Sequence, residues 1–258
     1  MARKNSYPFL TLCSVGLSLC LVLSADLSTQ GQESSEQSTN RQTQLNRSVL
    51  QVTFDPPGDG EPDNTAGGAS RDGRKCPNDA IAPGSPITSL TPATHQGLTV
   101  AERPAFFVYV PPTSAQTAFF TLKDDTEDYY YQVTLPLPKT PGIVSVRLPD
   151  DAPALEIGKS YQWSFVTICG AQLAVDDPRV EGWIQRIELN PSLMGQIQKM
   201  TPLERAAVYG ADGIWYDTVT TLAELKRSNP NDAAITASWE ELLKSVGLEA
   251  IASKPLVQ

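Results

Sequence analysis

The sequence has 258 residues, of which 40% are hydrophobic and 19% are charged. This composition is typical of a globular protein with a hydrophobic core, and the length allows one medium-sized domain with a small appendage. The formal net charge is −9, and phosphate backbones and anionic lipid surfaces repel a net negative chain. We therefore expect neither nucleic acid as a partner nor docking to membranes through a polybasic surface.

Residues 1–25 are predicted to be a signal peptide. Arg3 and Lys4 precede an uncharged, mostly apolar stretch at 9–24, and the small residue Ala25 suits the position before a cleavage site. The alternative is an uncleaved membrane anchor, but a stretch of about 16 residues is shorter than the roughly 20 that a bilayer span requires. We therefore expect an exported protein in the periplasm or the extracellular medium, with no stable membrane span after cleavage.

Residues 26–75 are predicted to form a disordered polar leader followed by a linker rich in proline and glycine. The leader has too few apolar side chains to offset the chain entropy lost on folding. A short apolar run at 49–54 is a candidate edge strand.

Two cysteines remain after signal cleavage, Cys76 and Cys169. An isolated pair in an oxidising compartment usually forms one disulfide bond. The alternative, a reactive or metal-binding pair, requires a C-x-x-C spacing or nearby histidines, and the pair has neither. We therefore predict a structural disulfide between these two residues.

Residues 76–189 are predicted to form an antiparallel β-sandwich of the immunoglobulin or fibronectin type. Segments with strand character recur between clusters of Pro, Gly and Asp, and no helical periodicity interrupts them. Leu155, Gly158 and Tyr161 resemble a tyrosine corner, in which the Tyr hydroxyl bonds to the upstream backbone. The expected strands lie at 87–90, 105–110, 118–123, 129–135, 143–148, 160–169 and 182–189.

Residues 190–258 are predicted to form a C-terminal helical subdomain. Asn190 and Thr201 each precede a proline and suit the cap of a helix, and Glu204 completes a capping box with Thr201. The stretch 206–230 is similar to a single tetratricopeptide-type helix pair, although such arrays need about three repeats to bury a continuous core. Packing of the helices against the sandwich is the favoured alternative.

The C-terminal two-thirds of the chain also carries motifs that match a known family in order. These are Gly-Gly-Ala-Ser-Arg at 67–71, Glu-Arg-Pro-Ala-Phe-Phe at 102–107, Gly-Lys-Ser-Tyr-Gln-Trp at 158–163, Gly-Trp-Ile at 182–184 and Gly-Ile-Trp-Tyr-Asp at 213–217. The chain resembles the cyanobacterial family catalogued as a domain of unknown function, number 928. The resemblance covers about residues 49–256 and implies an exported protein of cyanobacterial type. The family has no assigned activity, so the resemblance assigns no catalytic residue.

Catalytic side chains are scarce in the sequence. The single histidine, His95, lies in a loop rich in Pro and Thr, and no G-x-S-x-G elbow accompanies it. One His cannot supply the usual ligand set of a zinc site, and no phosphate loop or dinucleotide fingerprint is present. We therefore predict no catalytic residue and no cofactor, and we favour a binding protein over an enzyme.

One acidic cluster is a candidate calcium site. Asp124, Asp125, Glu127 and Asp128 lie between two expected strands, where their oxygens could chelate a hard cation. The cluster has no EF-hand spacing, and the favoured alternative is a solvated hairpin tip whose charge protects the sheet edge.

Adjacent aromatic residues are the candidate ligand surface. On the strand that contains Tyr129, Tyr130 and Tyr131, alternate side chains face opposite ways, so part of this run is expected to point outward. Trp215 and Tyr216 are neighbours on a helix, about 100° apart, so one of them is expected at the surface. Exposed aromatic rings stack on sugars or pack against partner proteins. The alternatives are cross-strand pairs and a rim between sandwich and helices.

These observations predict an exported, non-enzymatic binding or envelope-structural module whose partner is an envelope protein or glycan. The alternatives are a carbohydrate-binding module and a carboxylate-dependent hydrolase of envelope or extracellular glycans.

Overall fold

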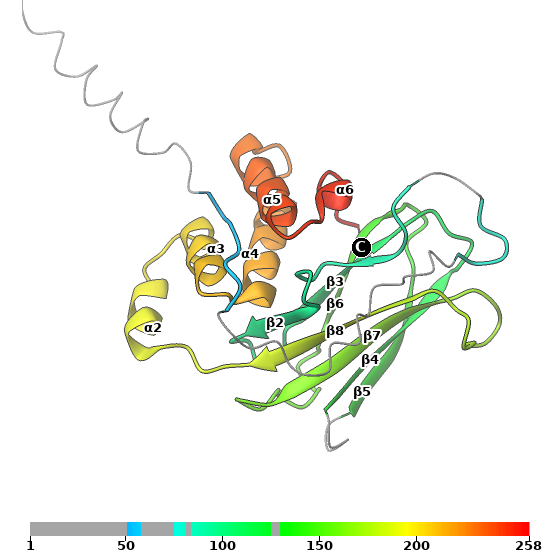
Figure 1. Cartoon of the computed structure of the whole chain (residues 1–258), viewed down its shortest axis with the longest axis horizontal. Helices are drawn as coiled ribbons and strands as arrows, with labels where there is room; N and C mark the ends of the chain where they lie inside the picture. The colour runs from blue at the N-terminus through cyan, green and yellow to red at the C-terminus, as the bar shows by residue number, and fades with distance from the viewer. Residues whose placement is uncertain (1–50, 58–74, 81–83, 125–129, 258) are drawn as a thin grey trace, which may run out of the picture. The chain divides into compact units, whose positions relative to one another are not determined.

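The structure is a computed structural model that describes residues 51–57, 75–80, 84–124 and 130–257. The predicted signal peptide and the leader up to residue 50 lie outside these ranges. The described residues all belong to one compact unit, Arg47–Gln258. Its strands are β1 (Thr88–Ser89), β2 (Gln96–Thr99), β3 (Ala105–Val110), β4 (Thr117–Asp124), β5 (Tyr130–Pro136), β6 (Gly142–Arg147), β7 (Ser160–Ile168) and β8 (Arg179–Arg186), and its helices are α2 (Pro191–Ile197), α3 (Pro202–Ala211), α4 (Trp215–Ser228), α5 (Ala233–Ser245) and α6 (Glu249–Ala252) (Figure 1).

The strands form two sheets. One has three strands in the order β1-β3-β6, and the other has five in the order β2-β8-β7-β4-β5. The inner faces meet at Phe106 of β3, whose ring centroid lies 4.9 Å from that of Phe120 in β4 and 5.5 Å from that of Trp163 in β7. The predicted β-rich fold is therefore confirmed, and each expected strand corresponds to an observed one with slightly different ends.

Alternation along β7 determines which side chains enter the core. Tyr161, Trp163 and Phe165 are buried, whereas Gln162 and Ser164 between them are partly exposed. This is the two-residue period of a strand with one face on the core. The Tyr161 hydroxyl accepts a hydrogen bond from the backbone N–H of Glu156 at 3.0 Å, which is the contact that the tyrosine-corner motif predicts.

The helices follow the sheets in the chain and share their hydrophobic core. Asn190 caps α2, and Thr201 and Glu204 form the predicted capping box at the start of α3. Helix α4 contributes Trp215, Val219 and Leu222 to the same buried cluster as the strands. Sheets and helices are thus stabilised together, and the predicted boundary near residue 190 lies within a single compact unit.

Cys76 and Cys169 form a disulfide bond, as predicted. The bond ties the segment before β1 to the end of β7, across a sequence separation of 93 residues. On the segment before β1, the Asp79 carboxylate accepts a hydrogen bond from the Cys76 N–H at 3.0 Å and another from the Ser114 hydroxyl at 2.8 Å.

Two elements were not predicted from the sequence, β2 and α6. Strand β2 pairs in parallel with β8, whereas the other strand pairs are antiparallel. The candidate edge strand at 49–54 is a wrong prediction for its described part, because residues 51–54 form no strand. Val52 and Phe54 are buried in the core cluster that includes the helices instead.

The C-terminal segment runs beside β6. The Ile143 N–H donates to the Pro255 carbonyl at 2.8 Å, and the Val257 N–H donates to the Ile143 carbonyl at 2.9 Å. Among the described residues, no helix has the length and apolar character needed to cross a membrane.

Candidate functional site

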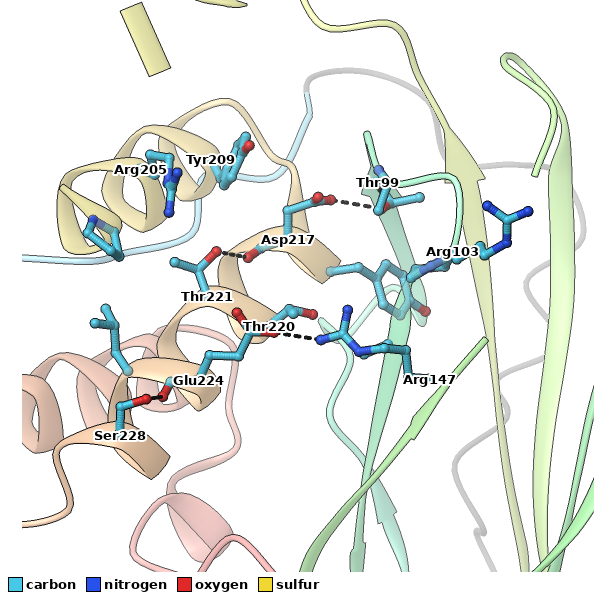
Figure 2. A pocket seen from close by; sticks show the side chains of 16 residues that line it. Thr99, Arg103, Arg147, Arg205, Tyr209, Asp217, Thr220, Thr221, Glu224 and Ser228 are labelled. Carbon is cyan, nitrogen blue, oxygen red and sulfur yellow. Dashed lines mark hydrogen bonds and ion pairs between the residues drawn. The ribbon is translucent and has the colours of Figure 1, made fainter. Parts of the chain in front are cut away.

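A cleft of about 410 Å³ lies where α3 and α4 face β2, β3 and β6 (Figure 2). Its walls are largely polar. The side chains that determine its chemistry are Arg103, Arg147, Arg205, Tyr209, Asp217 and Glu224.

Helix periodicity places the polar side chains on the cleft. Asp217, Thr220, Thr221 and Glu224 recur at intervals of three and four residues, so they line one face of α4. The opposite face carries apolar residues that enter the core. Arg205 and the residue four positions later, Tyr209, form the corresponding pair on α3.

Asp217 of α4 is hydrogen-bonded to the end of strand β2. Its Oδ2 accepts hydrogen bonds from the Thr99 hydroxyl at 2.8 Å and from the Val100 N–H at 3.0 Å, and Figure 2 shows the bond to Thr99. Burial raises the pKa of the Asp217 carboxyl above its ordinary value of 3.8, and the bonds from Thr99 and Val100 oppose this shift. A carboxyl with a raised pKa in a cleft is a candidate functional group as well as a structural one.

Two of the arginines already have partners. Arg147 pairs with Glu224 at 2.6 Å across the cleft, and both side chains are more than half exposed, so this ion pair is screened by solvent. The Nε of Arg103 donates to the Ala152 carbonyl at 3.0 Å, and its guanidinium also pairs with Glu102 at 3.7 Å. In Figure 2 the head of Arg103 points away from α4.

Arg205 is a cation of the cleft that has no ionic partner among the described residues. Its side chain is half-buried and makes no ion pair or hydrogen bond to any residue in the described ranges. Its positive charge acts on neighbouring Tyr209: burial and the charge of Asp217 raise the pKa of that phenol, and Arg205 partly offsets this increase. An unpaired guanidinium beside hydroxyl groups is suited to a carboxylate or another anion.

Trp215 and Tyr216 do not form the predicted partner surface. Trp215 is fully buried and its Nε1 donates to the Leu90 carbonyl at 2.8 Å. Tyr216 is 2% exposed; its hydroxyl accepts from Trp163 Nε1 at 2.7 Å and donates to the Trp183 carbonyl at 3.0 Å. The prediction of an exposed ring is wrong because this end of α4 enters the core, where buried partners satisfy the polar atoms of both rings. Tyr216 is nevertheless among the residues that line the cleft.

The tyrosine run and the acidic cluster are only partly described. Tyr130 pairs with Lys123 through the backbone of β5, but its side chain lies outside the described parts of the structure, as do residues 125–129. Tyr131 is half-buried and lies against Phe120, with ring centroids 6.5 Å apart.

Of the candidate calcium ligands, Asp124 is within the described ranges, whereas Asp125, Glu127 and Asp128 lie outside them. Asp124 is buried and pairs with Lys159 at 3.9 Å. Within the described ranges, no group of three or more His, Cys, Asp or Glu side chains could hold a metal ion.

Sequence reasoning did not single out the cleft residues. The polar stripe at Asp217, Thr220, Thr221 and Glu224 could have been read from the sequence as one face of an amphipathic helix. The positions of Arg147 and Arg205 on the facing walls could not, because they depend on how α3 and α4 dock on the sheets.

The comparison with protein families decides the assignment. The family model described as Domain of Unknown Function (DUF928) matches residues 66–256. The chain belongs to this family. The match includes both walls of the cleft and every described helix and strand, whereas the described segment 51–57 precedes it. A comparison with curated proteins gave no match.

Proposed function

We propose that this family member is an exported, non-enzymatic binding module and that its ligand is an acidic glycan of the cell envelope. The module would be a β-sandwich of the immunoglobulin type, with a ligand cleft between the sandwich and its helices. The Tyr161 bond to the Glu156 backbone and the packing of two sheets support this fold type. The Cys76–Cys169 disulfide supports an oxidising compartment and hence export.

The position of the Arg205 guanidinium in the cleft is the main support for this proposal. It is half-buried in the cleft wall and is not neutralised by an ion pair with another described side chain. The Tyr209 and Thr220 hydroxyls line the same cleft. A carboxylate on Arg205 with sugar hydroxyls on these side chains would use the donors and acceptors that the cleft offers.

Calorimetric titration with an oligogalacturonate and with a neutral oligosaccharide of equal length tests this function. We expect only the carboxylated sugar to bind, with affinity that falls as salt is added. Arg205→Ala should weaken this binding by about tenfold or more, because a charge-assisted bidentate contact is lost. The control is Arg179→Ala, an exposed arginine outside the cleft, which should leave binding unchanged. Equal binding of the neutral sugar, or no effect of Arg205→Ala, would refute the proposal.

A second candidate is a carboxylate-dependent hydrolase of such glycans. One observation favours it: Asp217 and Glu224 line the same cleft, and burial raises the pKa of Asp217, as a general acid requires. An assay for new reducing ends distinguishes the two functions. Turnover that is lost in Glu224→Gln, while the variant stays folded, would establish the hydrolase. Binding without turnover would leave the binding module.

A further inference from the structure

The segment 51–57 runs in an extended conformation along the helices, shown in blue between α3 and α5 in Figure 1. Val52 is fully buried and Phe54 is 9% exposed, whereas Gln51, Thr53 and Asp55 are exposed. Alternate side chains of an extended chain point to opposite sides. One side of the segment therefore enters the protein, although the segment belongs to no sheet.

Contacts with three helices hold this segment. The Phe54 ring packs edge-on against Trp215 at the start of α4, with ring centroids 5.0 Å apart. The Asp55 N–H donates to the Gly210 carbonyl of α3 at 3.0 Å. The Gln51 amide hydrogen-bonds to Glu241 of α5. Apolar anchors combined with a main-chain hydrogen bond are typical of peptide recognition.

Glycines make room for the backbone of the segment. A Cβ at position 210 would lie 2.2 Å from the Thr53 carbonyl oxygen, and one at position 213 would lie 2.8 Å from Pro57 Cδ. Gly210 lies inside α3, where glycine is less favourable than alanine. The close approach of the segment explains why a small residue is needed there. Because the Cβ at position 210 would meet the backbone oxygen of Thr53, a movement of side chains could not relieve the clash.

We propose that α3, α4 and α5 form a peptide-binding groove for an extended apolar–x–apolar–Asp segment, and that residues 51–57 are its intramolecular ligand. The groove lies within the range of the family match, which begins at residue 66, whereas the segment precedes that range. Groove and ligand are thus distinct parts of the chain. A ligand tethered to its site has a high effective concentration, so a segment that binds weakly as a free peptide still occupies the groove.

A cleavable form of the whole mature chain tests this proposal. A specific protease site is introduced within 58–74, the chain is cut, and the leader fragment is removed by dilution and dialysis. A fluorescent peptide with the sequence of residues 47–57 is then titrated with the remaining body, and its anisotropy is measured. We expect saturable binding that unlabelled peptide reverses.

Matched variants locate the contact. Phe54→Ala in the peptide should weaken binding by about tenfold or more, as for a buried aromatic anchor, and Thr53→Ala, at an exposed position, should have little effect. Gly210→Ala in the body should abolish binding. Its control is Gly195→Ala in α2, where an added Cβ meets nothing within 4 Å. Gly210→Ala should also raise the melting temperature of the cut body and lower that of the uncut chain, because alanine favours the helix but displaces the segment.

Two outcomes would overturn the proposal. One is a body that stays folded by circular dichroism but binds neither the leader fragment nor the peptide. The other is a body that unfolds once the leader fragment is removed, because the segment would then be an integral part of the core. Neither outcome bears on the acidic-glycan proposal, because no described residue of the segment lines the cleft that contains Arg205.

Discussion

Asp217 shows how a single half-buried carboxyl couples stability to pH. Burial raises its pKa above the ordinary 3.8, so the folded protein binds this proton more tightly than the unfolded chain does. The protonated Asp217 carboxyl therefore stabilises the folded state fully below about pH 4, which is near the pKa of an Asp side chain in the unfolded protein. This stabilisation is lost as pH rises through the raised pKa of the folded state.

We predict that the stability of the wild type relative to Asp217→Asn falls as pH rises above about 4. The substituted side chain does not titrate, so the difference between the two proteins isolates this group. Urea unfolding at each pH gives the two free energies. A difference that increases with pH for Asp217→Asn would mean that the hydrogen bonds from Thr99 and Val100 outweigh burial.

The burial of both Trp215 and Tyr216 could not be predicted from the sequence. Their angular separation on a helix is about 100°, which places them on different sides of an isolated helix. The structure buries both, because β2, β3 and the segment 51–57 surround the first turn of α4. A sequence pattern gives the direction of a side chain from its helix, and it does not give the number of elements packed around that helix.

Elements with local signals were predictable, and elements without them were not. The capping box of α3 involves only the four consecutive residues from Thr201 to Glu204, so it can be recognised in the sequence. Strand β3 is a continuous run of apolar side chains, and the predicted strand has the same ends, Ala105 and Val110. Strand β2 has the sequence Gln-Gly-Leu-Thr, which contains one glycine and one large apolar residue. Its parallel partner β8 lies far along the chain, so no hairpin turn marks the pair.

The close packing of α4 on β2 gives a prediction at this scale. A Cβ on Gly97 of β2 would lie 2.8 Å from Tyr216 Cε2 and 3.0 Å from Trp215 Cβ. Gly97→Ala should therefore force the helix away from the strand and lower the free energy of unfolding by about 2 kcal/mol. Urea denaturation measures the change. Gly170→Ala, where an added Cβ meets nothing within 4 Å, is the control and should change stability little. Equal stabilities for the two variants would contradict the tight packing.

Among the described residues, the sheets and helices share one hydrophobic core and are linked by the Cys76–Cys169 disulfide. The disulfide closes a loop over 93 residues that contains β1–β7. In the chain-entropy description, a loop of this length stabilises the folded state by about 4 to 5 kcal/mol.

Replacing Cys76 and Cys169 together by alanine should lower the melting temperature substantially, because the unfolded chain regains the entropy of the open loop. Thermal unfolding with and without reductant measures this. Reductant should lower the melting temperature of the wild type toward that of the double variant and should leave the double variant unchanged. A wild type that is fully reduced by thiol labelling, yet melts at its original temperature, would disprove the stabilising role.

The pairing of residues 255–257 with β6 affects self-association of the protein. β6 is the last strand of its sheet, and a last strand presents free N–H and C=O groups that can recruit a strand from another chain. Pro255 and Val257 engage both backbone groups of Ile143 at this position. A copy in which this tail has detached would offer a bare, apolar sheet margin, and two such copies could continue each other's sheet. We therefore expect the tendency to aggregate at high concentration to increase when the contacts of residues 255–257 with β6 are lost.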